Sequence, residues 1–388
     1  MTATRTVDVL VVGAGHAGRA AAARLAALGA GTVEVLEREA GGAPRPSGGA
    51  VIRTGVTVTG WAGPLTLDTT SPAGLARVTA RAVILATGAR ERPRAARLVP
   101  GTRPAGVLTG GELRRAVYGY GQAVGTRAVV VGADAAAFGA MRALRHAGVE
   151  VAAIVTEEVG RTSHGWRPAP VLSGTTVTEL LGRGRLSGVR LRHHDGREAT
   201  VACDTVVFTG DWVPEHEPAR LGGVVLDPGT RGPAVDGAFR TSVAGVFAVG
   251  DVLHGGEPAG TAVAEGRAVT GPVLSFLSGA VSWPERSVQV VVDAPLRWVT
   301  PSRIGGPAGG GFLLRAAERL VRPVVTVRQE GAVLHRQRVW RTATPSRSVV
   351  LAGGWTGRVD PDGGPVRITV AGRPPGRHGS ARPSAWWG

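Results

Sequence analysis

The feature that most constrains the fold is a glycine-rich loop between two strand-like segments near the N-terminus. Residues 7–12 form a largely apolar run typical of a buried strand, and the loop 13–18 that follows has glycine at its first, third and sixth positions. Residues 19–28 are small and helix-favouring, and residues 32–37 predict a second strand that ends in Glu37. Glu37 lies 19 residues beyond Gly18. A dinucleotide-binding βαβ unit places an acidic residue roughly 20 residues after its last glycine, so the spacing favours such a unit.

Each glycine has a physical role in a unit of this kind. Gly13 makes the tight turn, Gly15 lets a pyrophosphate approach the backbone, and Gly18 lets the helix pack closely on the strand. The N–H groups at the start of the helix attract phosphate, and Glu37 can accept hydrogen bonds from a ribose. His16 is expected to be a packing or phosphate-proximal residue and not a base. The alternative is an ordinary glycine-rich loop in a chain that is rich in alanine and glycine.

Length and charge bound the class of protein. The 388 residues, 43% of them hydrophobic, predict two or three domains with sizeable cores. The formal net charge is +16, and every basic residue is arginine. Residues 281–388 hold 16 arginines against six acidic residues, but these arginines are scattered. Dense basic runs are what usually mark a polyanion site, so compositional bias explains the arginines better than an acidic partner does, and no nucleic-acid partner is expected.

Three further observations narrow the setting. No stretch of about 18 apolar residues is present, so no membrane span is predicted. The chain enters a strand by Val7 without a signal-like segment. The single cysteine, Cys203, precludes a disulfide or a thiol pair within the chain. We therefore expect a cytoplasmic enzyme that does not associate with membranes.

A second unit of the same kind is expected farther along the chain. Residues 127–131 predict a strand that runs into Gly132, residues 135–147 a helix, and residues 149–156 a strand followed by Glu157. Residues 261–278 predict a helix, weakened by Gly266, Gly271 and Pro272. From residue 287 onward, short β-like runs alternate with glycine and proline, which predicts a small all-β appendage.

Three separated motifs point to one site. They are the loop 13–18 with Glu37, the segment Ala86-Thr87-Gly88 after an apolar strand, and the segment Val249-Gly250-Asp251. Together, over roughly residues 7–278, they resemble the two-dinucleotide-binding-domain flavoproteins of the pyridine nucleotide-disulfide oxidoreductase superfamily. Within it, residues 41–45, which include Gly42 and Arg45, and residues 86–93 resemble the FAD subunits of amino-acid, opine and cyanide-forming dehydrogenases.

The resemblance implies an α/β fold with two Rossmann-like dinucleotide-binding domains. An FAD-binding domain, residues 1–104 and 204–280, would be interrupted by an NAD(P)-binding-like domain, residues 105–203. A β-rich C-terminal domain, residues 281–373, and a flexible tail, residues 374–388, would follow.

The resemblance also implies roles for single residues. The loop 13–18, with His16 and Ala17, would hold the FAD pyrophosphate, and Glu37 the adenosine ribose. Arg38 would lie beside the adenosine, and Val58 would touch the adenine through its backbone. Ala86, Thr87 and Gly88 would pack on the cofactor where the chain leaves the FAD domain.

On the flavin side, Gly250 and Asp251 would bring a carboxylate to a ribityl hydroxyl. Thr261 and Ala262, at the start of a helix, would direct N–H groups at the pyrimidine edge of the flavin, where reduced flavin develops negative charge. The alternative for Asp251 is an acidic residue in a turn at the end of a strand.

The second fingerprint departs from the pattern. After Gly132 the loop reads Ala133-Asp134, so a carboxylate replaces the central glycine where a pyrophosphate would lie. Its bulk and its charge both oppose binding. Glu157 could still accept a hydrogen bond from a ribose 2′-hydroxyl and would repel a 2′-phosphate, which favours NADH over NADPH. The alternative is a domain that keeps the fold and binds nucleotide weakly or not at all.

Other residues carry weaker signals. Cys203 cannot supply the thiol pair of the classical disulfide reductases, and the short segment 42–51 could widen the cofactor site or abolish tight FAD binding. His193 and His194 adjoin an Asp195-Gly196 turn, for which an exposed hairpin is favoured over a metal site because no further ligands follow at recognisable spacing. No metal is expected. His254 and Glu257 are candidates for polar groups on the substrate side.

The expected function is that of an FAD-dependent oxidoreductase, not a disulfide reductase. It would pass hydride or electrons between NAD(H), NADP(H) or a small amine-type substrate and another acceptor, and no catalytic acid or base can be assigned. A small-molecule substrate or a redox partner protein is expected, with a hetero-oligomer as one arrangement. The alternative is a non-catalytic or electron-relay subunit of a multi-subunit dehydrogenase.

Overall fold

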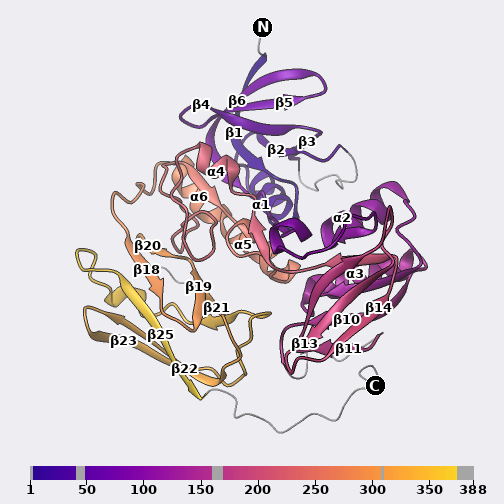
Figure 1. Ribbon diagram of the computed structural model, residues 1–388. Coiled ribbons are helices and arrows are strands. Elements are labelled where there is room, and N and C mark those ends of the chain that lie inside the picture. The colour runs from indigo at the N-terminus through magenta and orange to yellow at the C-terminus, as the bar shows by residue number, and fades with distance from the viewer. Residues whose placement is uncertain (1–2, 41–48, 160–168, 307–309, 374–388) are drawn as a thin grey trace. The chain divides into compact units, whose positions relative to one another are not determined.

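The computed structural model describes residues 3–40, 49–159, 169–306 and 310–373 (Figure 1). Contacts within the chain divide it into two units. Unit 1 consists of the residues up to Ala89 and from Pro214 onward, and unit 2 runs from Arg90 to Val213. The chain leaves unit 1 at β7 (Ala89–Glu91) and returns to it at β16 (Trp212–Pro214). The narrower domain limits given above, at residues 104, 204 and 281, remain predictions.

Unit 1 is built on a sheet with the strand order β3-β2-β1-β6-β5-β4, to which β17 adds by pairing with β6. The central strand β1 (Ala3–Val12) runs parallel to β2 (Val33–Glu37) and to β6 (Gly74–Leu85), and β17 (Val246–Ala248) runs parallel to the end of β6. The outer strands are β3 (Val51–Thr54), β4 (Thr57–Gly63) and β5 (Thr66–Ser71).

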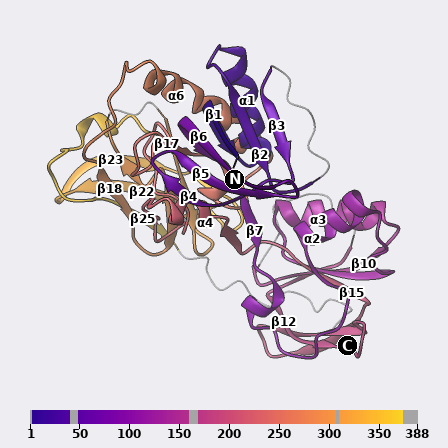
Figure 2. The same ribbon diagram turned by 90° about the horizontal axis from the view of Figure 1, so that it is seen from above.

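The central strand buries both of its faces. Val9 and Val11 lie in one core with residues of α1 (His16–Ala27) and α6 (Thr270–Leu277), which cover the same side of the sheet (Figure 2). Leu10 and Val12 lie in a second core on the other side, with Ala219 of α4 (Glu217–Leu221). Successive side chains of a strand alternate between faces, so a strand covered on both sides must be apolar throughout. This packing fixes where β1 ends and where the loop 13–18 begins.

Unit 2 is also built on a central sheet that is covered on both sides. Its five strands are all parallel, in the order β11-β10-β9-β15-β8. On one side lie α3 (Ala135–His146), α2 (Gly110–Arg114) and the π-helical turn η2 (Arg115–Gly119), and on the other lies the antiparallel sheet β12-β13-β14 (Figure 2). The parallel strands are β8 (Val107–Thr109), β9 (Arg127–Val131), β10 (Glu150–Thr156), β11 (Val171–Ser173) and β15 (Thr205–Phe208). The antiparallel strands are β12 (Thr175–Leu181), β13 (Gly188–His193) and β14 (Glu198–Ala202), and η1 (Arg94–Arg97) is a short 3₁₀ turn.

The C-terminal β strands belong to unit 1. They form two sheets, with the orders β20-β18-β25-β22-β23 and β19-β21-β24, around a core that contains Phe312, Leu314, Val327, Trp355 and Ile368. The strands are β18 (Val288–Val292), β19 (Leu296–Thr300), β20 (Arg303–Ile304), β21 (Phe312–Ala316), β22 (Val321–Gln329), β23 (Ala332–Arg338), β24 (Val349–Leu351) and β25 (Val366–Arg373), with the 3₁₀ turn η4 (Thr356–Arg358). The first strand, β18, pairs in parallel with the last, β25. Two Rossmann-like domains and a β-rich C-terminal part confirm the predicted fold class.

The helix predicted over residues 261–278 is wrong in extent. The structure has α5 (Ala259–Ala268) and α6, with a break at Val269. Pro258, whose φ is fixed and which has no N–H, stands directly before α5 and suits a helix start. Pro272 cannot donate to the carbonyl of Ala268, so a continuous helix would lose that bond, and a second helix that begins at Thr270 places the proline in its first turn instead.

Candidate functional site

The loop between β1 and α1 is closely packed except at one point. Gly13 has a φ of +106°, and a Cβ atom on it would lie 2.3 Å from the carbonyl oxygen of Ala86. A Cβ atom on Gly18 would lie 2.0 Å from the carbonyl oxygen of Gly13. Among the residues that the structure describes, a Cβ atom at Gly15 would meet nothing within 4 Å, and no side chain of theirs caps the first turn of α1. The N–H groups at the start of α1 are therefore available to an anion as far as the described residues go, and the phosphate site stays a prediction.

Glu37 lies beside this opening. One oxygen of its carboxylate accepts a hydrogen bond from the N–H of Ala14 (2.8 Å), and the other accepts one from the N–H of Glu39 (2.9 Å). The neighbouring Arg38 is exposed and forms an ion pair with Glu215 (3.4 Å). Val58 lies on β4, partly buried against the second core of unit 1. An acidic group at the end of β2 is thus fixed next to the glycine loop.

The segment Ala86-Thr87-Gly88 continues from β6 and meets the loop. The N–H of Ala86 donates to the carbonyl of Val12 (2.9 Å). The hydroxyl of Thr87 donates to the carbonyl of Glu215 (2.7 Å), whose N–H donates to the carbonyl of Gly88 (2.9 Å). These bonds hold together the two stretches of unit 1 that precede and follow the insertion of unit 2.

The Gly250–Asp251 turn packs on the start of α1. It forms the 3₁₀ turn η3 (Gly250–Val252) directly after β17. A Cβ atom on Gly250 would lie 2.8 Å from the Cβ of Ala17, and one on Gly266 of α5 would lie 2.2 Å from the carbonyl oxygen of Ala17. The three motifs that the sequence analysis singled out therefore converge on the N-terminus of α1.

Some predicted site residues have other positions. The N–H of Thr261 donates to the carbonyl of Pro258 (2.8 Å), and Ala262 is buried one position farther along α5. The exposed start of this helix is Ala259 and Gly260, because the helix begins two residues earlier than predicted. His16 is exposed as the first residue of α1. Gly42 and Arg45 lie outside the described residues.

These features fit FAD. The open N-terminus of α1 suits a pyrophosphate, the fixed carboxylate of Glu37 suits a ribose, and Asp251 lies in a turn that packs against the same helix end. All of them belong to unit 1.

The corresponding point of unit 2 is filled by the chain itself. A Cβ atom on Gly132 would lie 2.1 Å from the hydroxyl oxygen of Thr209, so this glycine has the tight packing of Gly13. One carboxylate oxygen of Asp134 accepts a hydrogen bond from the N–H of Ala137 (3.0 Å), and the side chain caps α3. A carboxylate thus occupies the helix end at which a pyrophosphate would bind, whereas none of the described side chains caps α1 in this way. Glu157 is exposed just after β10. The start of α3 therefore suits the pyrophosphate of NAD(P)H less well than the start of α1 suits the pyrophosphate of FAD.

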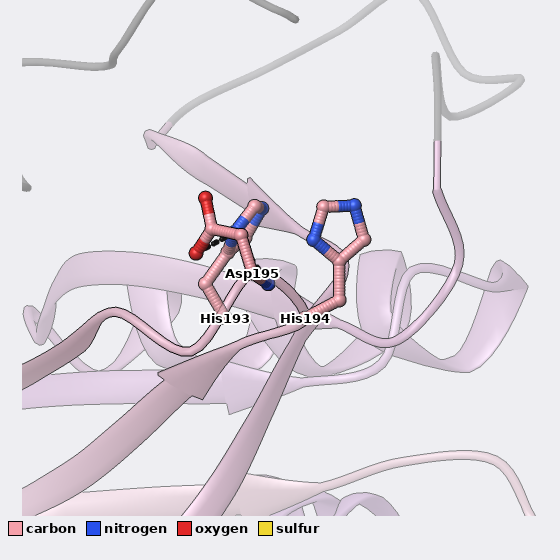
Figure 3. Close-up of side chains that lie close together, drawn as sticks. All are labelled: His193, His194 and Asp195. Carbon is pink, nitrogen blue, oxygen red and sulfur yellow. Dashed lines mark hydrogen bonds and ion pairs between the residues drawn. The ribbon is translucent and has the colours of Figure 1, made fainter. Parts of the chain in front are cut away.

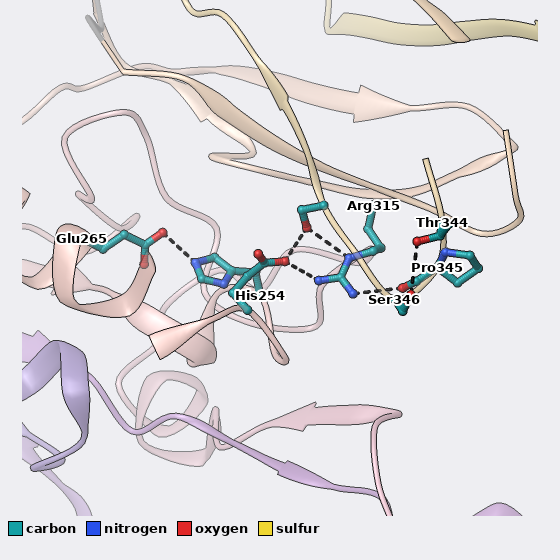
Figure 4. Close-up of polar contacts among 8 residues, drawn as sticks. His254, Glu265, Arg315, Thr344, Pro345 and Ser346 are labelled. Carbon is teal, nitrogen blue, oxygen red and sulfur yellow. Dashed lines mark hydrogen bonds and ion pairs between the residues drawn. The ribbon is translucent and has the colours of Figure 1, made fainter. Parts of the chain in front are cut away.

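His254 and Glu257, the candidates for substrate-side groups, are both engaged within the protein. His254 is buried, and its Nε2 lies 2.6 Å from an oxygen of Glu265 on α5 (Figure 4). Burial by itself disfavours the charged imidazolium. The attraction and hydrogen bond of Glu265, together with the carboxylates of Asp251 and Glu257, outweigh it and raise the pKa of His254 to about 9. Glu257 accepts bonds from Arg315 and Ser348. The interpretation of these two residues as substrate contacts is therefore replaced by one of internal pairing.

The His193, His194 and Asp195 cluster forms the turn of the predicted hairpin between β13 and β14 (Figure 3). One potential ligand atom of each lies within 4.8 Å of the others. The carboxylate of Asp195 is already bound to Arg197 (2.7 Å) and to Nδ1 of His193 (2.8 Å), and hydrogen bonds from these two groups hold its pKa below the usual range. A metal ion would have to displace both partners, so the geometry favours an ion-paired turn.

Three residues that contact the Gly250 turn or the segment after it were not predicted from the sequence: Glu265, Trp298 and Arg315. Glu265 carried a usable signal, because it is the acidic residue within a short helix of mostly small residues. Trp298 and Arg315 come from distant strands, β19 and β21, and no local pattern marks them.

No helix among the described residues is long and apolar enough to cross a membrane.

Comparison with known proteins supports the assignment of the fold. Residues 170–266 match the family described as pyridine nucleotide-disulphide oxidoreductase. The chain is 28% identical over 289 residues to the benzene 1,2-dioxygenase system ferredoxin–NAD(+) reductase subunit of Pseudomonas putida, an alignment that covers 64% of this chain and 66% of that protein. It is 31% identical over 224 residues to the dihydrolipoyl dehydrogenase of Pseudomonas aeruginosa, covering 51% of this chain and 47% of that protein.

Two solved structures have the same fold over most of the chain. The thioredoxin reductase of T. acidophilum, at 24% identity, covers 72% of this chain and 100% of its own with a TM-score of 0.58. The NAD-dependent persulfide reductase of A. fulgidus, at 16% identity, covers 83% of this chain and 68% of its own with a TM-score of 0.56. These matches make the chain similar to the pyridine nucleotide-disulphide oxidoreductases over residues 170–266. The two solved structures show that its two Rossmann-like domains have the fold of these reductases.

Proposed function

We propose that the protein is an FAD-dependent oxidoreductase that passes hydride or electrons between NAD(P)H or a small amine-type substrate and another acceptor. The observation that carries this proposal is the convergence of the uncapped N-terminus of α1, the carboxylate of Glu37 and the Gly250–Asp251 turn within unit 1. When bound, FAD would supply the hydride and electron chemistry, while the protein positions it and tunes its charge.

In this proposal the residues of unit 1 act by binding and orienting. The loop from Gly13 to Gly18 would hold the pyrophosphate, and Glu37 would hold the adenosine ribose, with Arg38 and Val58 near the adenine. On the other side, the exposed start of α5 replaces Thr261 and Ala262 as the source of N–H groups toward the flavin, because the N–H of Thr261 is already bonded. The remaining proposed cofactor contacts are Ala86, Thr87, Gly88, Gly250 and Asp251.

Disulfide reduction is disfavoured by the chemistry of Cys203. It is the single cysteine of the sequence, and it lies in unit 2 among apolar residues. Burial raises the pKa of its thiol to about 11, so almost none of it is thiolate at neutral pH. Neither a thiol pair nor a reactive single thiol is available for disulfide exchange.

The source of electrons follows from Asp134. Because a carboxylate already caps α3, a small reduced substrate or a partner is the stronger candidate donor, and NAD(P)H is the competing one. Exposed Glu157 would favour NADH over NADPH if either bound. We propose a cytoplasmic setting for this chemistry.

The test is spectroscopic. The purified chain, reconstituted with FAD, should show the visible bands of bound flavin, and anaerobic additions of NADH, NADPH and a panel of small secondary amines should identify the compound that bleaches them. No bound flavin after reconstitution would overturn the proposal. Bleaching by both nicotinamides at comparable rates would overturn the argument from Asp134 and Glu157.

A specific surface favours the second candidate function, an electron-relay subunit that docks on an acidic partner protein. On the five-stranded C-terminal sheet, Arg328 pairs with Arg367, and Arg336 and Arg338 of β23 lie opposite residues of β22 that point away from the core. Directly paired residues of antiparallel strands share a face, so four arginines gather on the outer face of this sheet. Arg336 and Arg338 are exposed, and Arg367 is also ion-paired with Asp293.

The two functions are separable by experiment. Turnover of substrate by the isolated flavin-loaded chain with a small artificial acceptor would count against a pure relay. If a second subunit co-purifies, the double variant R336E/R338E should release it, whereas R142E, on an exposed position of α3, should not. Retention of the subunit by R336E/R338E would refute docking on this face.

A further inference from the structure

Glu265 links the cofactor turn to a buried histidine. One of its carboxylate oxygens accepts a hydrogen bond from the N–H of Gly250 (2.8 Å), and the other lies 2.6 Å from Nε2 of His254. Gly250 directly precedes Asp251 and packs against Ala17 of α1. A single side chain on α5 therefore ties the turn that packs on the phosphate loop to the segment that follows it.

His254 is held from its other side by the C-terminal strands. It is almost fully buried, and its ring stacks on Trp298 of β19 with 6.5 Å between ring centroids. The guanidinium of Arg315 on β21 lies over the Trp298 ring, 5.1 Å from its centroid. Trp298 is only 7% exposed, so its indole is a buried neighbour of both the histidine ring and the guanidinium.

Arg315 also binds the segment that directly precedes α5 in the sequence. It is ion-paired with Glu257, which stands just before the Pro258 that precedes this helix, and both side chains are only 8% exposed. Ser348 donates to the same carboxylate, and Arg315 donates in turn to Ser348 (3.1 Å) and to the carbonyl of Pro345 (3.0 Å). Figure 4 shows two neighbouring groups of contacts, the Glu265–His254 pair and the contacts that run from Arg315 to the 344–346 segment.

We propose that Glu265, His254, Trp298, Arg315 and Glu257 form a brace that positions the Gly250–Asp251 turn and the start of α5 for FAD. The C-terminal β strands are thereby a working part of the cofactor site and not an independent appendage. The five residues are positioning residues, which act through the turn and need not touch the cofactor. This inference rests on the proposed binding of FAD in unit 1.

The first test compares two tryptophans of the same β region. Trp298→Ala removes the ring that contacts His254 and Arg315, and Trp340→Ala, at a position 73% exposed, is the matched control. Fluorescence titration of the full-length apoprotein with FAD should show a dissociation constant raised by about tenfold or more for W298A and by less than about twofold for W340A. Thermal unfolding of both variants checks that they are folded at the titration temperature.

The second test separates positioning from simple loss of packing. In Glu265→Gln the carbonyl oxygen can still accept from the Gly250 N–H, and the NH2 group can donate to Nε2 of a neutral His254, whereas Glu265→Ala keeps neither bond. FAD affinity and the visible spectrum of bound flavin should be largely retained in E265Q and lost or shifted in E265A. Equal affinity and identical spectra in wild type, W298A and E265A would overturn the brace. Absence of FAD binding by the wild type would instead overturn the proposed function.

Discussion

Replacement of Asp134 by glycine should open the second nucleotide site. In the structure one carboxylate oxygen of Asp134 caps α3 by accepting from the N–H of Ala137 at 3.0 Å, and a Cβ atom on Gly210 would lie 3.1 Å from the other oxygen. The carboxylate therefore sits at the helix end between two segments of unit 2. Asp134→Gly removes both its bulk and its charge, and it restores the glycine that a dinucleotide fingerprint has at this position.

The size of the effect can be worked out from the charge. A phosphate held at the same helix end would stand about 4 Å from the carboxylate, where two unit negative charges repel by about 1 kcal/mol in water and about 4 kcal/mol at an effective dielectric constant of 20. The expected gain in NADH affinity is therefore between about fivefold and about a thousandfold. The loss of the cap should cost only a few tenths of a kcal/mol in unfolding free energy when glycine replaces aspartate.

Isothermal titration of the full-length protein with NADH measures this directly. We expect weak or undetectable binding by wild type, clear binding by D134G, and an intermediate result for D134N, which keeps a capping oxygen and loses only the charge. Anaerobic bleaching of the flavin by NADH should rise in the same order. Tight NADH binding by the wild-type protein, unchanged in D134G, would refute the reasoning.

Three further predictions concern unit 1. Gly15→Ala should leave thermal stability unchanged but weaken FAD binding, whereas Gly18→Ala should lower the unfolding free energy by about 1–3 kcal/mol because its Cβ meets the backbone; equal destabilisation of the two variants would contradict this packing. Arg315→Met should cost about 3–5 kcal/mol by leaving Glu257 buried without its partner, and R315M/E257Q should recover part of that loss in urea denaturation; no recovery would count against the ion pair. His254, with its pKa raised from 6.5 to about 9, contributes stability that is complete below the unfolded-state value and is lost as the pH rises through the folded-state value. Unfolding free energy should therefore fall between about pH 6 and about pH 9, less steeply in H254Q, and parallel slopes would argue against the charged pair.

The glycine loop of unit 1 could be predicted because its determinants are local. Gly13, Gly15, Gly18 and Glu37 lie within one βαβ unit, where strand, turn and helix follow each other along the chain. The sequence showed only part of the role of Asp134. It showed that an aspartate stands where a dinucleotide fingerprint has glycine, but only the structure shows that its carboxylate accepts a hydrogen bond from the N–H of Ala137 in its own helix.

The contacts between distant segments could not be derived in the same way. Trp298 and Arg315 reach His254 and Glu257 through the folding of a separate β region, and no periodicity links strands so far apart in sequence. The prediction that His254 and Glu257 are substrate-side groups rested on their place in the chain just after Asp251. A charged side chain is buried only where other groups pair with it, and the burial of these two residues could not be predicted without knowing their partners.

The pairing of β18 with β25 bears on how the protein is made. Because the ribosome releases residues in order, Val288–Val292 can pair only with the short strand β20 until Val366–Arg373 have emerged. The nascent chain can complete the N-terminal βαβ unit early, whereas the core shared by the two C-terminal sheets, one of which carries Trp298 and Arg315, closes only when β25 has been released. If the proposed brace positions the flavin site, full flavin affinity would be reached only after translation, and a product truncated before β25 would keep the phosphate loop but bind its ligand more weakly.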